Sequence, residues 1–377
     1  MAEKMKLGVL TGGGDCPGLN AVIRAVVKTA VSDYDMEVVG FLDGYEGLIE
    51  NRYRTLKSSD VSGILALGGT ILGTSNRADP FHYPVLQGDE YIYLDRSSQA
   101  LQNFERLGLD ALIAIGGDGT MAASNGMAQK GLNIIGVPKT IDNDLYGTDQ
   151  TFGFDSAVAS ATDAIDKIHT TAQAHHRVMI VEVMGRYAGW LALASGVAGG
   201  GDIILIPEVP YHIDVIVDKI RSRNRKGRNF SIIVIGEGAK PEGGEMVVKK
   251  VVKNSPDQLR LGGISYQLAA QIEGIANIET RVTILGHLLR GGTPTAFDRL
   301  LASQFGCEAV RLADAGKFGQ MVALRGGLID SIPIVEAAGR IRKVSYDTPL
   351  LKAAVSLDTS MGAENLDVLK TAQAVTG

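Results

Sequence analysis

The chain has 377 residues, more than one average domain, so two lobes or one large α/β unit is expected. Its formal net charge of −5 argues against nucleic acid or a membrane surface as an electrostatically bound partner. Hydrophobic residues make up 45% and aromatic residues 6%, a balance typical of an aliphatic α/β core. The 47 glycines often stand in pairs or triplets, which indicates functional turns rather than low complexity.

The N-terminus runs directly into an apolar strand over 7–10, so no signal peptide is expected. No apolar run approaches the ~20 residues that a transmembrane helix needs. Cys16 and Cys307 match no zinc or CxxC spacing, and we interpret them as reduced structural thiols. These features predict a cytoplasmic protein without a membrane anchor.

Residues 5–30 predict a strand, a glycine turn and a helix, with Pro17 near the helix start. The alternation of strand, loop and helix continues through the first half of the chain. Further strands are expected at 37–41, 64–67, 111–115 and 134–137. Such alternation predicts a parallel sheet flanked by helices, with an active site at the carboxyl ends of the strands.

A second series of elements begins after a helix over about 157–171. Its strands are expected at 177–183, 202–206, 231–235 and 281–285. We therefore predict an α/β protein of two Rossmann-like, three-layer α/β/α lobes with mainly parallel sheets. The predicted parts are residues 1–153 with 291–340 as one lobe, 154–290 as the other, 84–98 as an inserted loop or hairpin, and 341–377 as a peripheral C-terminal extension.

The glycine turn TGGGD (11–15) carries little information by itself, because glycine-rich turns after strands are common. It lacks the G-x-G-x-x-G fingerprint of dinucleotide-binding folds, and the chain has no Walker GxxxxGK[ST] motif. A nucleotide must therefore bind through another architecture. The histidines at 169, 175 and 176 show no metal-ligand spacing, and we interpret them as structural.

The motif GGDGT (116–120) closes the apolar run 111–115. Its glycines let backbone N–H groups approach phosphate oxygens, because no Cβ blocks them. Asp118 supplies a hard oxygen ligand suited to Mg²⁺. The same motif occurs in lipid and NAD kinases, so it does not identify the substrate, and a turn with a solvated aspartate is the structural alternative.

The motif PKTIDND (138–144) places Asp142 and Asp144 two residues apart after another apolar run. In an extended segment this spacing puts both carboxylates on one face. Neighbouring carboxylates raise each other's proton affinity, which suits one of them to act as a base near neutral pH. We interpret Asp142 as the base for an attacking hydroxyl and Asp144 as its tuning or metal-assisting partner, with a capped turn as the alternative. Together the two motifs predict a phosphotransferase.

The motif MGRYAGW (184–190) follows a predicted strand and opens a helix. The N–H groups of that helix start and Arg186 therefore predict an anion site. Glu237 ends the apolar strand 231–235, where a carboxylate can bind sugar hydroxyls or cap the structure.

Four arginines near predicted strand ends provide several cations. The motif GHLLRGG (286–292) offers His287 and Arg290 beside flexible backbone, and Arg177 and Arg281 join Arg186 near other strands. The planar guanidinium group grips phosphate with two parallel hydrogen bonds. Taken together, these arginines predict binding of a phosphorylated sugar.

These motifs together resemble the 6-phosphofructokinase family over roughly residues 5–330. They occur in the family's order and approximate spacing as TGGGDCPGLNAVIRAV, GGTILGTSNR, GGDGT, PKTIDND, VEVMGRYAGW and TRVTILGHLLRGG. TGGGDCPGLN with PKTIDND is similar to the branch called group III or mixed-substrate. The resemblance implies transfer of the γ-phosphoryl group of MgATP to the 1-hydroxyl of fructose 6-phosphate, giving fructose 1,6-bisphosphate.

The resemblance also implies roles for individual residues. The catalytic set is Asp142 as base with Thr140, Asp144, Arg186 and Gly119. The donor and its Mg²⁺ are assigned to Gly14, Arg77, Asp118, Gly119, Thr120 and Lys139, with Asp118 on the metal. The sugar phosphate is assigned to Thr140, Asp142, Met184, Gly185, Arg186, Glu237, His287 and Arg290. Arg177 and Arg281 are expected to reach a neighbouring subunit's site, which predicts a homodimer or homotetramer.

The phosphoryl donor depends on two positions. Family members that use ATP resemble each other in carrying glycine at the position of Gly119, whereas pyrophosphate users carry an aspartate that blocks and repels an α-phosphate. Lys139 is similar to the pyrophosphate enzymes, and a lysine there can stabilise charge with either donor. Because Gly119 adds neither volume nor charge, we expect ATP, with pyrophosphate as the alternative donor.

Regulation and other activities are left as alternatives. Bacterial relatives bind an allosteric phosphate effector at positions that resemble Arg24, Lys28, Arg52, Lys226 and Arg228. His169 stands where that pattern has an arginine, so a solvated basic surface is the alternative. A lipid or NAD kinase would share only GGDGT, and a non-catalytic nucleotide-sensing subunit would lack Asp142.

Overall fold

The computed structural model describes residues 4–88, 90–251 and 259–366, and its larger sheet has seven strands in the order β15-β14-β7-β6-β1-β2-β3. These are β1 (Lys6–Thr11), β2 (Glu37–Phe41), β3 (Tyr53–Leu56), β6 (Ala111–Gly116), β7 (Ile134–Pro138), β14 (Gln320–Arg325) and β15 (Leu328–Pro333). The strands from β2 through β14 run parallel, and the outer strands β3 and β15 are antiparallel to their neighbours.

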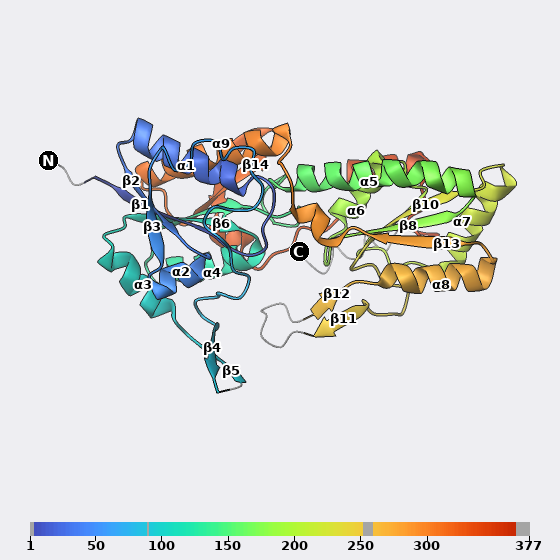
Figure 1. The fold of residues 1–377 in the computed structure, drawn as a ribbon, viewed down its shortest axis with the longest axis horizontal. Coiled ribbons are helices and arrows are strands. Elements are labelled where there is room, and N and C mark those ends of the chain that lie inside the picture. Colours follow the sequence, from blue (N-terminus) through green and yellow to red (C-terminus); the bar gives the residue numbers. More distant parts are fainter. Residues whose placement is uncertain (1–3, 89, 252–258, 367–377) are drawn as a thin grey trace.

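Helices cover both faces of this sheet, because successive side chains of a strand point to opposite sides. Ile113 and Ile115 of β6 belong to the core that contains α1 and α9, whereas Leu112 and Ala114 pack with α2, α3 and α4. These helices are α1 (Leu19–Asp33), α2 (Tyr45–Glu50), α3 (Ser97–Arg106), α4 (Asp118–Gln129) and α9 (Ala296–Asp314). Figure 1 shows α1 and α9 side by side over one face.

The second lobe lies beside the first and contains a fully parallel sheet in the order β13-β8-β10-β9 (Figure 1). Its strands are β8 (Val178–Val183), β9 (Ile203–Leu205), β10 (Ser231–Gly236) and β13 (Thr280–Ile284). The helices α5 (Phe154–His175) and α6 (Trp190–Ala198) share one core with Val181 and Val234. The helices α7 (Ile213–Arg225) and α8 (Ile264–Ala276) pack with Ile180 and Ile233 on the other face.

Two sheets that are mainly parallel and covered by helices confirm the predicted fold class. One predicted strand is wrong: residues 64–67 form a turn, in which Leu67 N donates to Ile64 O. Ile64 is buried there without strand pairing, and Leu67 at the other end of the run is 52% exposed. The predicted insertion contains a hairpin of β4 (Tyr83–Gln87) and β5 (Glu90–Leu94), which projects from the first lobe (Figure 1).

A second hairpin joins β11 (Val248–Val251) to β12 (Leu259–Leu261). After α9, strands β14 and β15 belong to the sheet of the first lobe, and α10 (Ile334–Ala337) and α11 (Pro349–Ser356) follow. Residues 341–366 pair with both lobes instead of forming a peripheral extension. Ile341 forms a β-bridge with Leu145 of the first lobe, and Ser360 forms one with Ile203 of the second. The rest of the predicted extension, 367–377, lies outside the described residues. Within the described ranges, no helix combines the length and apolar character needed to cross a membrane.

Candidate active site

The glycine loop after β1 is held from two sides by cations. Lys139 Nζ donates to the carbonyl of Gly14, and Arg290 Nη1 donates to the carbonyl of Asp15 at 3.1 Å. A Cβ at Gly14 would lie 2.5 Å from Arg290 Nη1, so only glycine lets the guanidinium approach so closely. Arg290 belongs to the short 3₁₀ helix η1 (Gly286–Arg290) that follows β13, so it joins the second lobe to the loop of the first.

The GGDGT motif ends β6 and opens α4, as its pattern predicts. Asp118 is the first residue of the helix and is exposed, and a Cβ at Gly119 would meet nothing within 4 Å. Thr120 is buried, and its hydroxyl packs under the backbone of Gly12 and Gly116. The loop therefore presents Asp118 and Gly119 outward while Thr120 supports the neighbouring turns.

The segment 74–77 lies beside the glycine loop. Thr74 Oγ1 donates to Gly13 O at 2.6 Å, and Gly13 N donates to Ser75 O at 3.1 Å. Arg77 follows and is exposed at the surface. This is the position that the resemblance implies for a donor contact.

The PKTIDND motif turns after β7, so the extended segment expected to put both carboxylates on one face is not formed, and a turn, the alternative, takes its place. Asn143 between them has a left-handed backbone with φ of 52°. Its side-chain oxygen accepts from Thr151 N at 3.0 Å, and Thr151 Oγ1 donates to Thr140 O at 2.7 Å. The two carboxylates still lie close enough to interact, because the turn rather than the pleat of a strand brings them together.

Asp142 has a buried carboxylate oxygen, Oδ1, with no hydrogen-bond partner among the described residues. Burial raises the pKa of Asp142, with Arg290, Lys139 and Arg186 opposing it and Glu237 adding to it. Burial also raises the pKa of Asp144, and the charge of Asp142 raises it further. Carboxylates tuned upward in this way are typical of proton-transferring groups.

The sugar-site candidates on the second lobe come together at the ends of β8 and β10. Glu237 N donates to Val183 O at 2.9 Å, and Gly238 N donates to Gly185 O at 3.2 Å, so Met184–Arg186 lies against Glu237. Burial raises the pKa of Glu237, and the charge of Arg186 lowers it. Glu237 and Arg186 are therefore close enough for their charges to interact.

The helix start predicted as an anion site binds a carboxylate of the protein itself. Helix α6 begins at Trp190, and the N–H of Gly189 donates to both oxygens of Glu208 at 3.0 and 3.1 Å. A carboxylate of the chain therefore occupies the position expected for a bound anion. Arg186 remains on the loop before the helix, and His287 is exposed on η1 beside Arg290.

Arg177 and Arg281 lie away from this cluster. Arg177 precedes β8 and Arg281 is near the start of β13, so both are at the amino ends of parallel strands, opposite the loops described above. Both pair with Glu279, Arg177 through Nε at 2.6 Å. The four predicted arginines therefore do not form one site within a single chain.

The carboxylates suit a magnesium ion bound together with phosphate. No cluster of three or more His, Cys, Asp or Glu residues that could hold a metal ion occurs in the described ranges. Mg²⁺ usually takes only one or two carboxylates and fills its other positions with water and substrate phosphates. The charge of Asp118 raises the pKa of Asp144, and a cation between such carboxylates relieves their repulsion. The donor set therefore fits Mg²⁺.

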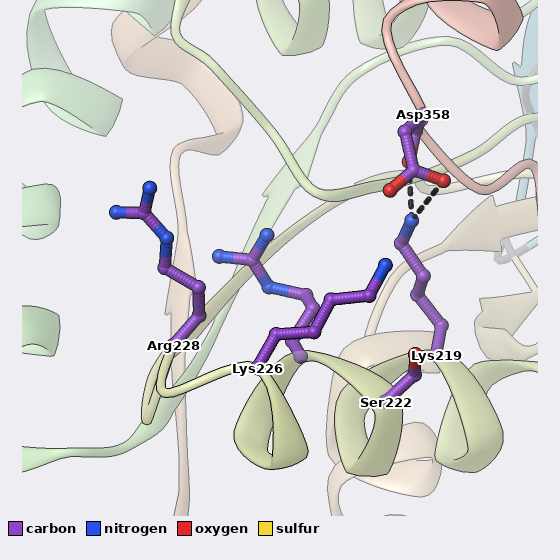
Figure 2. A pocket seen from close by; sticks show the side chains of 6 residues that line it. Lys219, Ser222, Lys226, Arg228 and Asp358 are labelled. Atoms are coloured by element: carbon purple, nitrogen blue, oxygen red, sulfur yellow. Dashed lines mark hydrogen bonds and ion pairs between the residues drawn. The ribbon is translucent and has the colours of Figure 1, made fainter.

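A second basic cluster lines a cavity of about 440 Å³ in the second lobe. Figure 2 shows Lys226 and Arg228 there, with Lys219 pairing with Asp358 at 2.9 Å. Arg52 of the predicted effector set instead pairs with three carboxylates of its own lobe, Asp43, Glu46 and Glu50. His169 packs edge-on against Phe230. Within one chain, Lys226 and Arg228 of that set line this cavity, whereas Arg24 and Lys28 lie one turn apart on α1 of the first lobe.

Two further residues of the site were not predicted from the sequence. Glu208 follows a short strand and reads as a loop carboxylate, and Arg342 lies beyond the last motif. Arg342 donates to the Asn143 carbonyl between the two aspartates, through Nη2 at 3.1 Å. No local pattern indicates a contact that spans 199 positions. Both thiols are free, as the cysteine spacing predicted.

Comparison with known proteins shows the family of this chain. Residues 6–313 match the family described as "Phosphofructokinase". A Clostridium perfringens protein named ATP-dependent 6-phosphofructokinase 2 is 49% identical over 357 residues, 94% of this chain and 98% of the relative. A Chloroflexus aurantiacus ATP-dependent 6-phosphofructokinase is 49% identical over 365 residues, 96% and 99% of the two chains. Solved Pichia pastoris phosphofructokinase in the T-state superimposes with a TM-score of 0.78 at 30% identity, covering 100% of this chain and 40% of that longer chain. The chain belongs to the phosphofructokinase family.

Proposed function

We propose that the protein is an ATP-dependent 6-phosphofructokinase, a phosphotransferase that moves the γ-phosphoryl group of ATP to the 1-hydroxyl of fructose 6-phosphate. The product is fructose 1,6-bisphosphate, which places the enzyme in glycolysis. The observation that carries the proposal is the buried Asp142 Oδ1 without a partner among the described residues, at the junction of the two lobes. Relatives with 49% identity over nearly the whole chain, named for this activity, support it.

In this proposal Asp142 is the general base. Its raised pKa keeps it a competent proton acceptor near neutral pH, and its free oxygen is available to the acceptor hydroxyl. Arg290 and Lys139 hold the glycine loop, and their charges face Asp142 and the transferring group. Asp144 beside it tunes its proton affinity, and the hydroxyl of Thr140 accepts from Asp142 N at 3.1 Å.

Substrate positions follow from the two lobes. We assign the donor phosphates to the loops of the first lobe, with contacts from Gly14, Arg77, Asp118, Gly119, Thr120 and Lys139. We assign the sugar phosphate to the second lobe, with contacts from Met184, Gly185, Arg186, Glu237, His287 and Arg290. In domain terms, residues 1–153 with 291–340 hold the donor and residues 154–290 hold the sugar.

Asp118 and Asp144 are the residues that would hold Mg²⁺. The ion, when bound with the donor, neutralises charge on the phosphoryl oxygens. The exposed position of Asp118 at the start of α4 leaves room for the waters and phosphates that complete such a site.

The remaining proposals concern branch, assembly and location. The motifs TGGGDCPGLN and PKTIDND support the group III or mixed-substrate branch. The arginine pair at the sheet edge away from Asp142 supports a homodimer or homotetramer, in which Arg177 and Arg281 serve a neighbouring subunit's site. A glycolytic role supports a cytoplasmic location.

An aldolase-coupled assay with fructose 6-phosphate and Mg²⁺, comparing ATP with pyrophosphate, tests the proposal. Turnover with ATP alone is the expected result, because Gly119 leaves space for an α-phosphate. Turnover with pyrophosphate instead would favour the alternative in which Lys139 decides the donor. Activity with neither donor would reject the acceptor.

A further inference from the structure

Residues 340–346, which we call the strap, contact both the PKTIDND loop of the first lobe and the second lobe. Ile341 pairs with Leu145 in an antiparallel bridge, and Arg342 N donates to Asp144 O at 2.6 Å. The backbone of the strap therefore pairs with the backbone of the PKTIDND loop, as two short antiparallel strands would. It adds hydrogen bonds at the point where the loop leaves its turn.

The side chain of Arg342 fastens the peptide between the two aspartates. Its Nε and Nη2 donate to the carbonyl of Asn143 at 3.3 and 3.1 Å. Asn143 holds a left-handed backbone, which costs free energy and persists only where the surroundings enforce it. A guanidinium that grips this carbonyl with two N–H groups is suited to enforce the turn.

The other side of the strap is fastened to the second lobe. Trp190 Nε1 donates to Arg342 O at 2.7 Å, and the guanidinium lies 4.3 Å from the centre of the indole ring. Val344 N donates to Glu208 Oε1 at 2.8 Å, and the same carboxylate accepts from Gly189 N. The strap thus links the loop of the proposed base to the helix that follows the proposed sugar loop.

We infer that Arg342 is a positioning residue for the phosphoryl transfer, holding the Asp142–Asp144 turn in its reactive shape and in register with the sugar loop. This inference rests on the proposed function. Arg342 acts through the backbone carbonyl of Asn143 and is assigned no contact with substrate. Misplacing a reacting group by about 1 Å can cost roughly 100-fold in rate, so the effect belongs in kcat.

The test replaces Arg342 by methionine, which keeps an unbranched apolar stem beside Trp190 and removes the donors. We expect Arg342→Met to lower kcat roughly 10- to 100-fold while both KM values stay within about 3-fold. Arg342→Lys retains the positive charge but loses the planar pair of N–H donors. Its kcat is expected to lie between the values of the wild type and of Arg342→Met. Arg340→Ala is the matched control, because Arg340 lies in the same strap, is exposed, and stacks on Tyr146 at 3.9 Å.

Trp190 is the one tryptophan in the sequence, so its fluorescence reports on the strap directly. Its emission is expected to change in Arg342→Met and Arg342→Lys and not in Arg340→Ala. Wild-type kcat in Arg342→Met, or an equal loss in Arg340→Ala, would overturn the inference. If Arg342→Met does not fold, Arg342→Lys carries the test, and a wild-type kcat there has the same meaning.

The two proposals fail in different ways. If the wild-type protein does not phosphorylate fructose 6-phosphate with either donor, the proposed function is rejected, whatever the variants do. If the wild-type protein is active and the Arg342 variants match it in kcat and emission, only the positioning role is rejected.

Discussion

Asp142 combines a buried, unpartnered oxygen with a raised pKa among the described residues. Asp142→Asn keeps the shape of the side chain and removes the proton acceptor. We expect kcat to fall about 10²- to 10⁴-fold, with little change in the KM for fructose 6-phosphate. Steady-state kinetics measure both, and the exposed Asp163 on α5 provides the matched control, Asp163→Asn. A loss of less than 10-fold would remove Asp142 from the role of base.

Gly119 is a position where a side chain can be added without disturbing the protein, because a Cβ there meets nothing within 4 Å. Gly119→Asp is therefore expected to lower kcat/KM for ATP by at least 10-fold through volume and charge facing the α-phosphate. Gly119→Asn adds nearly the same volume without the charge and separates the two causes. Unchanged ATP kinetics in both variants would refute the steric account of donor choice.

At the scale of elements, the N-termini of α5 and α9 are joined by a buried network. Asp298 Oδ2 accepts from Ser156 N at 2.8 Å and from Ser156 Oγ at 2.5 Å, and Ser156 Oγ accepts from Thr295 N at 3.0 Å. Burial raises the pKa of Asp298 to about 6. The folded protein therefore binds this proton more tightly than the unfolded chain does.

The pH dependence of stability follows from that difference. As pH rises from 3.8 toward about 6, the unfolded chain releases the proton first, so the Asp298 contribution lowers the free energy of unfolding. Asp298→Asn has no proton to lose, so its stability relative to wild type is expected to rise across this window by up to about 3 kcal/mol. Urea unfolding of both proteins at each pH measures the change. A pH-independent difference between the two proteins would contradict it.

The elements that could be predicted from the sequence are those with buried apolar runs between glycine turns. Strands β1, β2, β6 and β7 follow such runs, because strands buried on both faces are continuously hydrophobic. The run at 64–67 is also apolar but lies in a turn, with Ile64 buried and Leu67 exposed, so an apolar composition does not require strand pairing. The turn at Asn143 was given only as the alternative to an extended segment, because the residue pattern of a short loop does not reveal a left-handed residue.

At the scale of the whole molecule, the local motifs of the site could be predicted from the sequence, but the distant residues that contact them could not. GGDGT and PKTIDND lie at the strand ends where the pattern placed them. Arg290 on Asp15 and Arg342 on Asn143 are contacts across 275 and 199 positions, which depend on how the lobes pack. The hydrogen bond from Gly189 N, at the start of α6, to Glu208 likewise depends on the three-dimensional fold.

The separation of Arg177 and Arg281 from Asp142 predicts sites shared between subunits. Asp142→Asn and an Arg177→Ala/Arg281→Ala variant should each be nearly inactive alone. Dissociated and reassembled together, they should regain activity, roughly a quarter of wild type for random dimers, because one site of each mixed dimer is then complete. Each variant reassembled alone is the control. No recovery in the mixture would show that the arginines do not serve the neighbouring site.

The hydrogen bonds between Arg342 and Asn143 also have a consequence for biosynthesis. Synthesis runs from the N-terminus, so the loop that carries the proposed base leaves the ribosome 199 residues before the guanidinium that fastens it. A nascent chain can therefore complete the central strands of the first sheet while the Asp142–Asp144 turn has its bonds with Thr151 but not yet those with Arg342. Translation products that stop before the strap would lack the fastening of this turn by Arg342.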